Sequence, residues 1–144
     1  GHRVPGVVSW PAVVRGRRES WDTVVTMDFL ATVMDVLGVS RPANQASWAF
    51  DGKSILPILR GEPWPERGIG WMYYEPRRSV RNGYGFRYGR WKLVVGSESC
   101  KRESCRRPQL YDLSSDLGER HDLAGEHPEI LEAIQANFTA WHES

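Results

Sequence analysis

The 144-residue sequence predicts an α/β chain that ends in a small α+β subdomain. Val7 and Val8 form a short β-branched run with prolines on both sides, which is typical of a brief, fully buried strand. Apolar residues between positions 27 and 37 recur with the helical period. From Gly68 onward the period changes to two, and the chain then ends in an amphipathic helical pattern.

The composition, with 40% hydrophobic and 26% charged residues, is that of an ordinary globular chain. No apolar run approaches the ~20 residues that a membrane-spanning helix needs. A buried strand so near the first residue needs neighbours on both sides, and the sequence supplies them on one side only. We therefore interpret the chain as the C-terminal part of something larger.

Residues 1–65 are predicted to hold the strand, a buried helix and loops. Thr26 can cap a helix from Met27 to about Leu37, and Gly38 suits the position that follows its end. The apolar side chains of this helix cover one broad arc, which we expect to face a sheet: Met27, Phe29, Leu30, Val33, Met34, Val36 and Leu37. Asp28, Thr32 and Asp35 share the opposite face, where we expect the two carboxylates to be solvated.

A second, shorter helix is predicted from Ile55 to Leu59, with Ser54 as its cap and Gly61 after its end. Pro63 and Pro65 then make a stiff connector. We place the boundary between the two parts of the chain there, so that residues 66–144 form the second part.

Residues 66–144 are predicted to be a four-stranded antiparallel sheet with one C-terminal helix. The expected strands are Ile69–Tyr74, Gly83–Phe86, Arg90–Val95 and Gln109–Leu113, with a hairpin turn at Tyr88-Gly89. Alternation along the third strand sends Trp91 inward and Lys92 outward. The helix starts at Pro128, and its core-facing stripe is Ile130, Leu131, Ile134, Phe138 and Trp141.

The net charge of +1 is unevenly distributed. Between Arg77 and Arg107 lie ten Lys and Arg against two acids, whereas Pro108 to Ser144 holds one base against eight acids. Such asymmetry marks either a site for an anionic partner or two segments that pack together and neutralise each other. The aromatic residues among these bases are explained by strand alternation, so we do not expect nucleic-acid binding.

Two kinds of covalent modification are suggested by the pattern. Cys100 and Cys105 are too few for a zinc site and do not form a C-x-x-C motif, so they form either a small disulfide ring or two free thiols. Asn137-Phe138-Thr139 fits the N-x-[ST] acceptor pattern for glycosylation, although it flanks the apolar stripe of the last helix.

No nucleophile with its base, no metal-ligand spacing and no phosphate-binding glycine loop is evident in the sequence. Five segments nevertheless form a recognisable series, and in chain order they are Gly1–Pro11, Val25–Gly38, Asp51–Gly61, Phe86–Leu93 and Leu110–Glu119. They resemble the family segments E-G-G-x-R-V-P-x-x-x-x-W-P, D-x-x-P-T…G, D-G-x-S-L-x-P-x-L-x-G, x-R-x-G-x-W-K-L and L-Y-D-L-x-x-D-P-x-E.

By order and spacing, this series resembles the C-terminal part of a type I sulfatase of the arylsulfatase family, within the alkaline-phosphatase-like superfamily. Ala31 and Leu117 stand where the family has proline. The resemblance implies hydrolysis of sulfate esters by a formylglycine made from a cysteine or serine in C-x-P-x-R, with a calcium ion polarising the sulfate. Neither cysteine of this chain fits that motif, so the nucleophile and the metal ligands are expected upstream, and the fragment alone is expected to be inactive.

The resemblance also suggests which residues approach a substrate. His2 and Arg3 are expected nearest the chemistry, and Arg77, Arg78 and Arg81 are expected to contact a sulfated sugar or aryl sulfate. The implied partners are the N-terminal catalytic part and that anionic substrate, and the implied location is the secretory pathway, lysosomal or extracellular. A related phosphoester hydrolase and a non-catalytic basic module that binds anionic glycans remain the alternatives.

Overall fold

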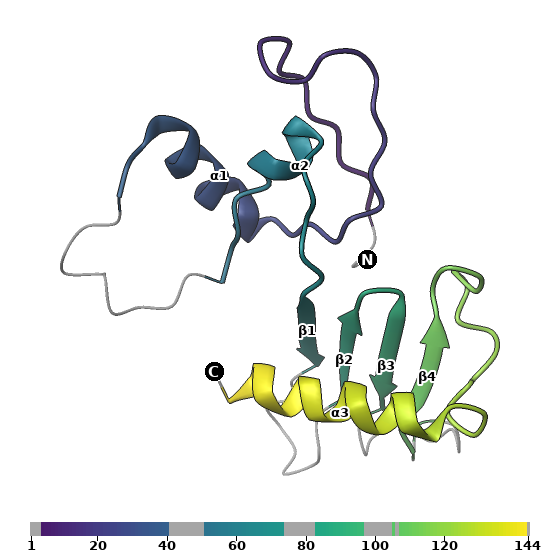
Figure 1. Cartoon of the computed structure of the whole chain (residues 1–144). Helices are drawn as coiled ribbons and strands as arrows, with labels where there is room; N and C mark the ends of the chain where they lie inside the picture. The colour runs from purple at the N-terminus through teal and green to yellow at the C-terminus, as the bar shows by residue number, and fades with distance from the viewer. Residues whose placement is uncertain (1–3, 41–50, 74–82, 97–104, 106, 144) are drawn as a thin grey trace. The chain divides into compact units, whose positions relative to one another are not determined.

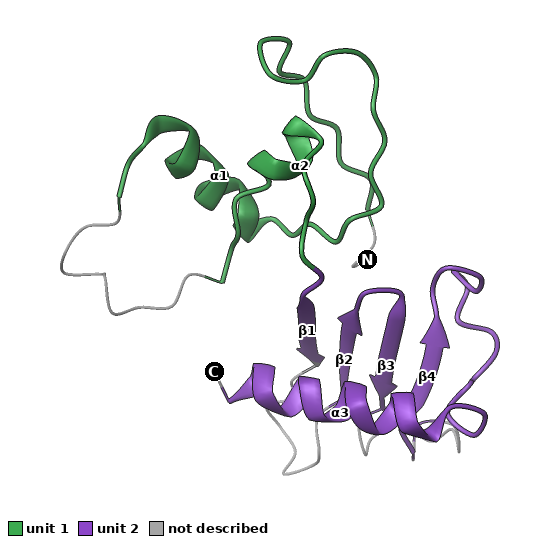
Figure 2. Cartoon of the chain, in the orientation of Figure 1, with its two compact units in different colours: residues 1–65 green, residues 66–144 purple. Residues whose placement is uncertain are grey.

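The computed structural model describes residues 4–40, 51–73, 83–96, 105 and 107–143 (Figure 1). The chain divides into two compact units, residues 1–65 and residues 66–144 (Figure 2). The division falls directly after Pro65, within the proline-containing connector.

The first unit contains two helices, α1 (Met27–Leu37) and α2 (Leu56–Arg60). The predicted bounds of α1 are confirmed, and Gly38 ends it with a left-handed φ of 63° that glycine adopts without strain. α2 begins one residue later than expected, and the Ser54 hydroxyl accepts a hydrogen bond from the Leu56 N–H at 3.3 Å. Gly61, at φ 78°, follows its end.

The expectation of a buried strand at Val7 and Val8 is wrong for this structure. Residues 4–10 are irregular, and Val7 is 94% exposed. A strand needs a hydrogen-bonding neighbour, and the strands of the described residues all pair with one another in the second unit. The apolar pattern is present, but nothing in the described residues pairs with it.

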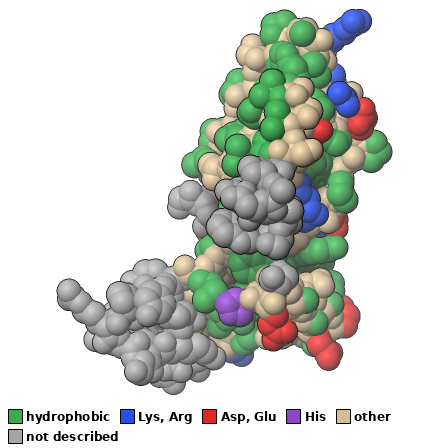
Figure 3. All heavy atoms as spheres, turned by 90° about the vertical axis from the view of Figure 1, so that its left-hand side faces the viewer, with side chains coloured by type: hydrophobic (Ala, Val, Ile, Leu, Met, Phe, Trp, Pro, Cys, Tyr) green, Lys and Arg blue, Asp and Glu red, His purple; other side chains and the backbone are tan. Residues whose placement is uncertain are grey.

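The expected orientation of α1 is also wrong, because its polar face is the buried one. Asp28 is fully buried and Thr32 is 8% exposed, whereas Phe29, Leu30 and Leu37 are more than half exposed. Figure 3 shows the side of the molecule that carries α1, where hydrophobic side chains make up much of the surface.

The reason lies in the hydrogen bonds that the polar face makes with residues 53–55. The Asp28 carboxylate accepts the Val25 N–H and the Lys53 N–H, each at 2.8 Å. The Thr32 hydroxyl donates to the Asp28 carbonyl and accepts the Ile55 N–H at 3.0 Å. The Ser54 hydroxyl donates to the Asp35 carboxylate at 2.6 Å. These contacts fix residues 53–55 against α1 and leave the apolar arc outside.

Gly52 completes this contact by its lack of a side chain. It is buried, and a Cβ at this position would collide with the carbonyl group of Met27 at the start of α1. The Asp51-Gly52 pair at the start of the segment Asp51–Gly61 therefore permits the close backbone approach that brings the Lys53 N–H to Asp28.

The second unit is a helix packed on a sheet, as predicted. Its strands are β1 (Gly68–Tyr73), β2 (Gly83–Tyr88), β3 (Trp91–Val95) and β4 (Gln109–Asp112), antiparallel in the order β1-β2-β3-β4. The hairpin turn lies at Gly89-Arg90, one residue beyond the expected place, because Tyr88 still pairs with Trp91. α3 (Pro128–His142) lies across one face of the sheet (Figure 1).

The core of this unit forms between α3 and the sheet. Its fully buried members are Phe86, Leu93, Val95, Leu110 and Ile134. Phe138 stacks on Tyr84 with ring centroids 4.0 Å apart and meets Phe86 edge-on at 5.8 Å. The predicted stripe of α3 thus faces the core, with Trp141 at its margin, 38% exposed.

We expect Asp28→Ala to lower the free energy of unfolding of the first unit by about 2 to 4 kcal/mol, because it removes two charge-assisted hydrogen bonds that a buried carboxylate accepts from the Val25 and Lys53 N–H groups. Chemical denaturation monitored by tryptophan fluorescence measures this. Asp51→Ala, at an exposed position nearby, is the control and should have little effect. Equal effects of the two substitutions would contradict the inverted helix.

Candidate functional site

All of the residues expected near a substrate lie outside the described part of the chain, namely His2, Arg3, Arg77, Arg78 and Arg81. Cys100, which was expected to form a disulfide, also lies outside it. Cys105 is described and is disulfide-bonded, although its pairing with Cys100 stays a prediction. Asn137 is exposed on α3. The roles assigned to all of these residues therefore stay predictions.

Three of the four described bases of the stretch from Arg77 to Arg107 contact the fold, namely Arg87, Arg90 and Lys92, whereas Arg107 is exposed. The Lys92 ammonium pairs with the Glu119 carboxylate and lies 5.3 Å from the ring centroid of Trp71. Its side chain is only 4% exposed, so the expectation that Lys92 points into solvent is wrong. A lysine on this face of β3 is buried because the turn after β4 supplies a carboxylate and β1 supplies an aromatic ring.

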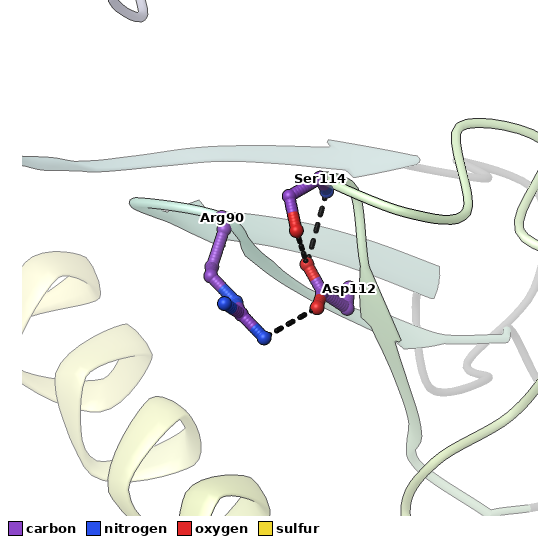
Figure 4. A network of polar contacts seen from close by, with 3 residues as sticks. All are labelled: Arg90, Asp112 and Ser114. Carbon is purple, nitrogen blue, oxygen red and sulfur yellow. Dashed lines mark hydrogen bonds and ion pairs between the residues drawn. The ribbon is translucent and has the colours of Figure 1, made fainter.

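A second pair joins the same two segments (Figure 4). The Arg90 guanidinium donates to the Asp112 carboxylate at 2.5 Å, and the Ser114 hydroxyl and N–H donate to its other oxygen at 2.6 and 2.9 Å. Burial alone would raise the pKa of Asp112, but the hydrogen bonds from Ser114 and the charge of Arg90 lower it below 3.8. This carboxylate therefore stabilises the fold above pH 3.8 and loses that contribution as the pH falls through its lowered pKa.

Asp116 holds the turn that carries Glu119. Its carboxylate accepts the N–H groups of Arg120 and His121 at 2.7 and 2.8 Å, and these bonds lower the pKa of Asp116. Glu119 has a left-handed φ of 53°, an uncommon conformation for a residue with a side chain. Asp116 thus stabilises the turn that places Glu119 beside Lys92.

These pairs decide between the two interpretations of the charge asymmetry for the described residues. Arg90 and Lys92 come from the basic stretch, and their partners Asp112 and Glu119 come from the acidic one. The two segments therefore lie side by side and neutralise each other at these positions. Arg87 donates from Nε to the Gly89 carbonyl at 2.9 Å, within the hairpin.

The described residues do not form a metal site. They include no cluster of three or more His, Cys, Asp or Glu side chains that could hold an ion. Asp28 and Asp112 instead accept N–H groups and a guanidinium. The calcium ion implied by the resemblance therefore does not fit the described part of this chain.

A pocket in the first unit offers little chemistry. It has a volume of about 390 Å³ and is lined by Trp10, Val13, Asp35, Val36, Leu56, Pro57 and Arg60. The Asp35 carboxylate is already hydrogen-bonded to Ser54, and the lining holds no nucleophile paired with a base. Separately, the helices within the described ranges are too short or too polar to cross a membrane.

The chain thus consists of a two-helix unit followed by a unit in which a helix packs on an antiparallel sheet. Residues 1–142 match the family model described as N-sulphoglucosamine sulphohydrolase, C-terminal. The chain belongs to this family, and it has the fold of the C-terminal part of a sulfatase.

Curated relatives of the chain are sulfatases. It is 28% identical over 142 residues to N-acetylgalactosamine-6-O-sulfatase of Bacteroides thetaiotaomicron. This alignment covers 93% of this chain and 26% of that protein. It is 26% identical over 163 residues to human arylsulfatase D, covering 97% of this chain and 27% of that protein. The chain thus spans about a quarter of the length of the relatives it matches.

Solved structures agree on the fold. The structure of BT4656 in complex with its substrate D-glucosamine-2-N,6-O-disulfate matches 81% of this chain and 23% of that one, with a TM-score of 0.59 and 23% identity. The structure of Ps i-CgsB matches 83% of this chain and 24% of that one, with a TM-score of 0.64 and 19% identity.

Sequence reasoning missed two structural centres, Asp28 and the Lys92–Glu119 pair. The sequence did contain a signal for the burial of Asp28. Asp28, Thr32 and Asp35 form a continuous polar row on the helix, and the irregular segment Asp51-Gly52-Lys53-Ser54 supplies hydrogen-bond donors that can pair with it. For the Lys92–Glu119 pair, the W-K-L and D-x-x-E segments can both be recognised in the sequence. Their contact could not be predicted, because it depends on the pairing of β3 with β4.

We expect Glu119→Gln to destabilise the second unit more than Lys92→Met does. Loss of Glu119 removes the carboxylate that pairs with a buried ammonium, which typically costs about 3 to 5 kcal/mol. Loss of Lys92 leaves a carboxylate that is 31% exposed and can be hydrated.

Chemical denaturation of the single variants and of the double variant measures the difference. The double variant should recover much of the stability lost in Glu119→Gln, because neither unpaired charge remains. A Lys92→Met effect as large as that of Glu119→Gln would contradict the asymmetry.

Proposed function

We propose that the chain is the C-terminal portion of a sulfuric ester hydrolase that acts on a sulfated sugar or an aryl sulfate. The observation that carries this proposal is the match of residues 1–142 to a single sulfatase family model. It is supported by the contacts of the motif residues, since Asp28, Lys92, Asp112 and Glu119 form hydrogen bonds or ion pairs within the fold.

In this proposal the nucleophile and the metal ligands come from residues outside the chain. Those residues would supply a formylglycine, whose hydrated gem-diol form offers the nucleophilic hydroxyl, and would hold a calcium ion that polarises the sulfate. Cys105 is not the precursor of that group, because its sulfur is in a disulfide and its sequence context is not C-x-P-x-R. The fragment alone is accordingly proposed to be inactive.

The first unit is proposed to bind the N-terminal catalytic part through the apolar arc of α1. Met27, Phe29, Leu30, Val33 and Leu37 are each at least half exposed on one side of this helix. Exposed apolar patches of this kind mark an interaction surface. The polar face is already satisfied within the unit, so the apolar arc is the side available to a partner.

The substrate is proposed to meet Arg77, Arg78 and Arg81, because sulfated sugars are anionic and these bases are close together in the sequence. The engagement of Arg90 and Lys92 in the fold argues against a free-standing basic module. A secretory, lysosomal or extracellular location is proposed as well, and the disulfide at Cys105 supports it because disulfides persist in oxidising compartments.

The function is tested with the full-length protein and matched sulfate and phosphate esters of one aryl alcohol. We expect hydrolysis of the sulfate ester. We also expect the triple charge reversal of Arg77, Arg78 and Arg81 to Glu to raise the KM for a sulfated glycan by about tenfold or more, with a smaller effect on kcat. An unchanged KM would remove these arginines from the substrate site. Hydrolysis of the phosphate ester alone would overturn the sulfatase proposal.

We expect Leu30→Glu with Val33→Glu to reduce self-association of the isolated chain and to disrupt assembly of the full-length protein. Two carboxylates on the apolar arc would have to be buried without partners in an interface, which is costly, so they favour exposure of this surface to solvent. Light scattering of the chain and activity of the full-length protein measure the two effects. Leu117→Glu, at an apolar side chain that is 52% exposed in the second unit, is the control. A full-length double variant that retains stability and activity would contradict the proposal.

A further inference from the structure

α3 carries an exposed asparagine beside its core-facing stripe. Asn137 and Thr139 are both exposed, whereas Phe138 between them turns toward the core and stacks on Tyr84. Asn137 thus flanks the apolar stripe, as expected from the sequence, and is nevertheless exposed. The segment is also the sole N-x-[ST] pattern among the three asparagines of the sequence.

One side of Asn137 leaves room for a bulky group. One turn away on that side are Ala133 and Ala140, and Ala136 precedes Asn137. All three alanines are exposed and carry only a methyl group. On the other side lie Ile134, which is buried, and Trp141, which is 38% exposed, so a substituent on the Asn137 amide would extend over the alanines.

An independent observation concerns the compartment. Cys105 is disulfide-bonded, and structural disulfides form where the environment is oxidising. In eukaryotic cells the oxidising lumen in which disulfides form is also where asparagine acceptors receive glycans. The cysteine and the acceptor segment lie in the same unit and indicate the same route.

We propose that Asn137 carries an N-linked glycan, an inference that rests on the proposed secretory route. The Asn137 amide nitrogen forms the bond to C1 of the first sugar, the bond between C1 and the pyrophosphate oxygen of a lipid-linked oligosaccharide breaks, the lipid pyrophosphate leaves, and the amide loses one proton to a base. The Thr139 hydroxyl is the second recognition element of the acceptor. The glycan extends over the exposed alanines of α3 and leaves the core-facing stripe unchanged.

The timing of the transfer follows from the geometry. Asn137 and Thr139 lie within the regular turns of α3, where the Thr139 hydroxyl donates to the Gln135 carbonyl at 3.1 Å. A transferase needs this segment extended so that amide and hydroxyl enter its site together. The glycan is therefore added before α3 packs on the sheet.

The test uses the full-length protein secreted from a eukaryotic cell line and digested with trypsin. The peptide that follows Arg120 contains a single asparagine, Asn137. Treatment with peptide N-glycosidase should convert Asn137 to aspartate, and mass spectrometry detects this conversion on the wild-type protein without any variant. A folded, secreted protein with unmodified Asn137 would overturn the proposal.

Variants provide the matched controls. Asn137→Gln and Thr139→Ala should abolish the modification, whereas Thr139→Ser should retain it because serine keeps the hydroxyl. Retention in Thr139→Ala would overturn the assignment to this acceptor. A thiol titration and an activity assay on the same secreted protein distinguish failure of this inference from failure of the proposed function. A disulfide-bonded, active protein without a glycan would contradict the inference and leave the proposed function unaffected.

Discussion

The buried carboxylate of Asp28 decides which side of α1 turns toward the rest of its unit. It accepts one N–H from the residues before the helix and one from residue 53, and it therefore joins two segments that have no regular structure of their own. Thr32 and Asp35 extend the same row of contacts along the helix. A buried carboxylate with satisfied hydrogen bonds is costly to move, so the apolar arc is left facing outward.

The second unit uses charge in a comparable way. A basic strand and an acidic turn are joined by the pairs Arg90–Asp112 and Lys92–Glu119, while α3 and the sheet enclose an apolar core. Trp141 packs closely enough on β1 that a Cβ at Gly70 would strike its ring. One face of the sheet is thus covered by hydrophobic packing against α3. The other face buries the Lys92–Glu119 ion pair, with the Trp71 ring beside the ammonium.

Local pattern was sufficient for the helices and for the strands of the second unit, but it was insufficient for their surroundings and wrong for the strand expected at Val7 and Val8. The bounds of α1 and the start of α3 at Pro128 follow from period, capping glycine and proline, which are properties of neighbouring residues. The orientation of α1 does not, because a helical wheel separates polar from apolar side chains without saying which set has partners. The same limit applies to Lys92, whose burial depends on a carboxylate 27 positions away. The roles expected for His2, Arg3 and the arginines near position 80 stay predictions for a further reason, since these residues lie outside the described part of the chain.

The contacts of Asp28 also bear on the order in which a protein of this kind assembles. Its more distant partner is 25 residues away, and closing a loop of that size costs only modest chain entropy. The hydrogen bonds that orient α1 can thus form from nearby chain alone, before any surface reaches its apolar arc. The proposed partner would then bind a helix whose orientation about its own axis is already fixed, so that only the apolar arc is presented to it.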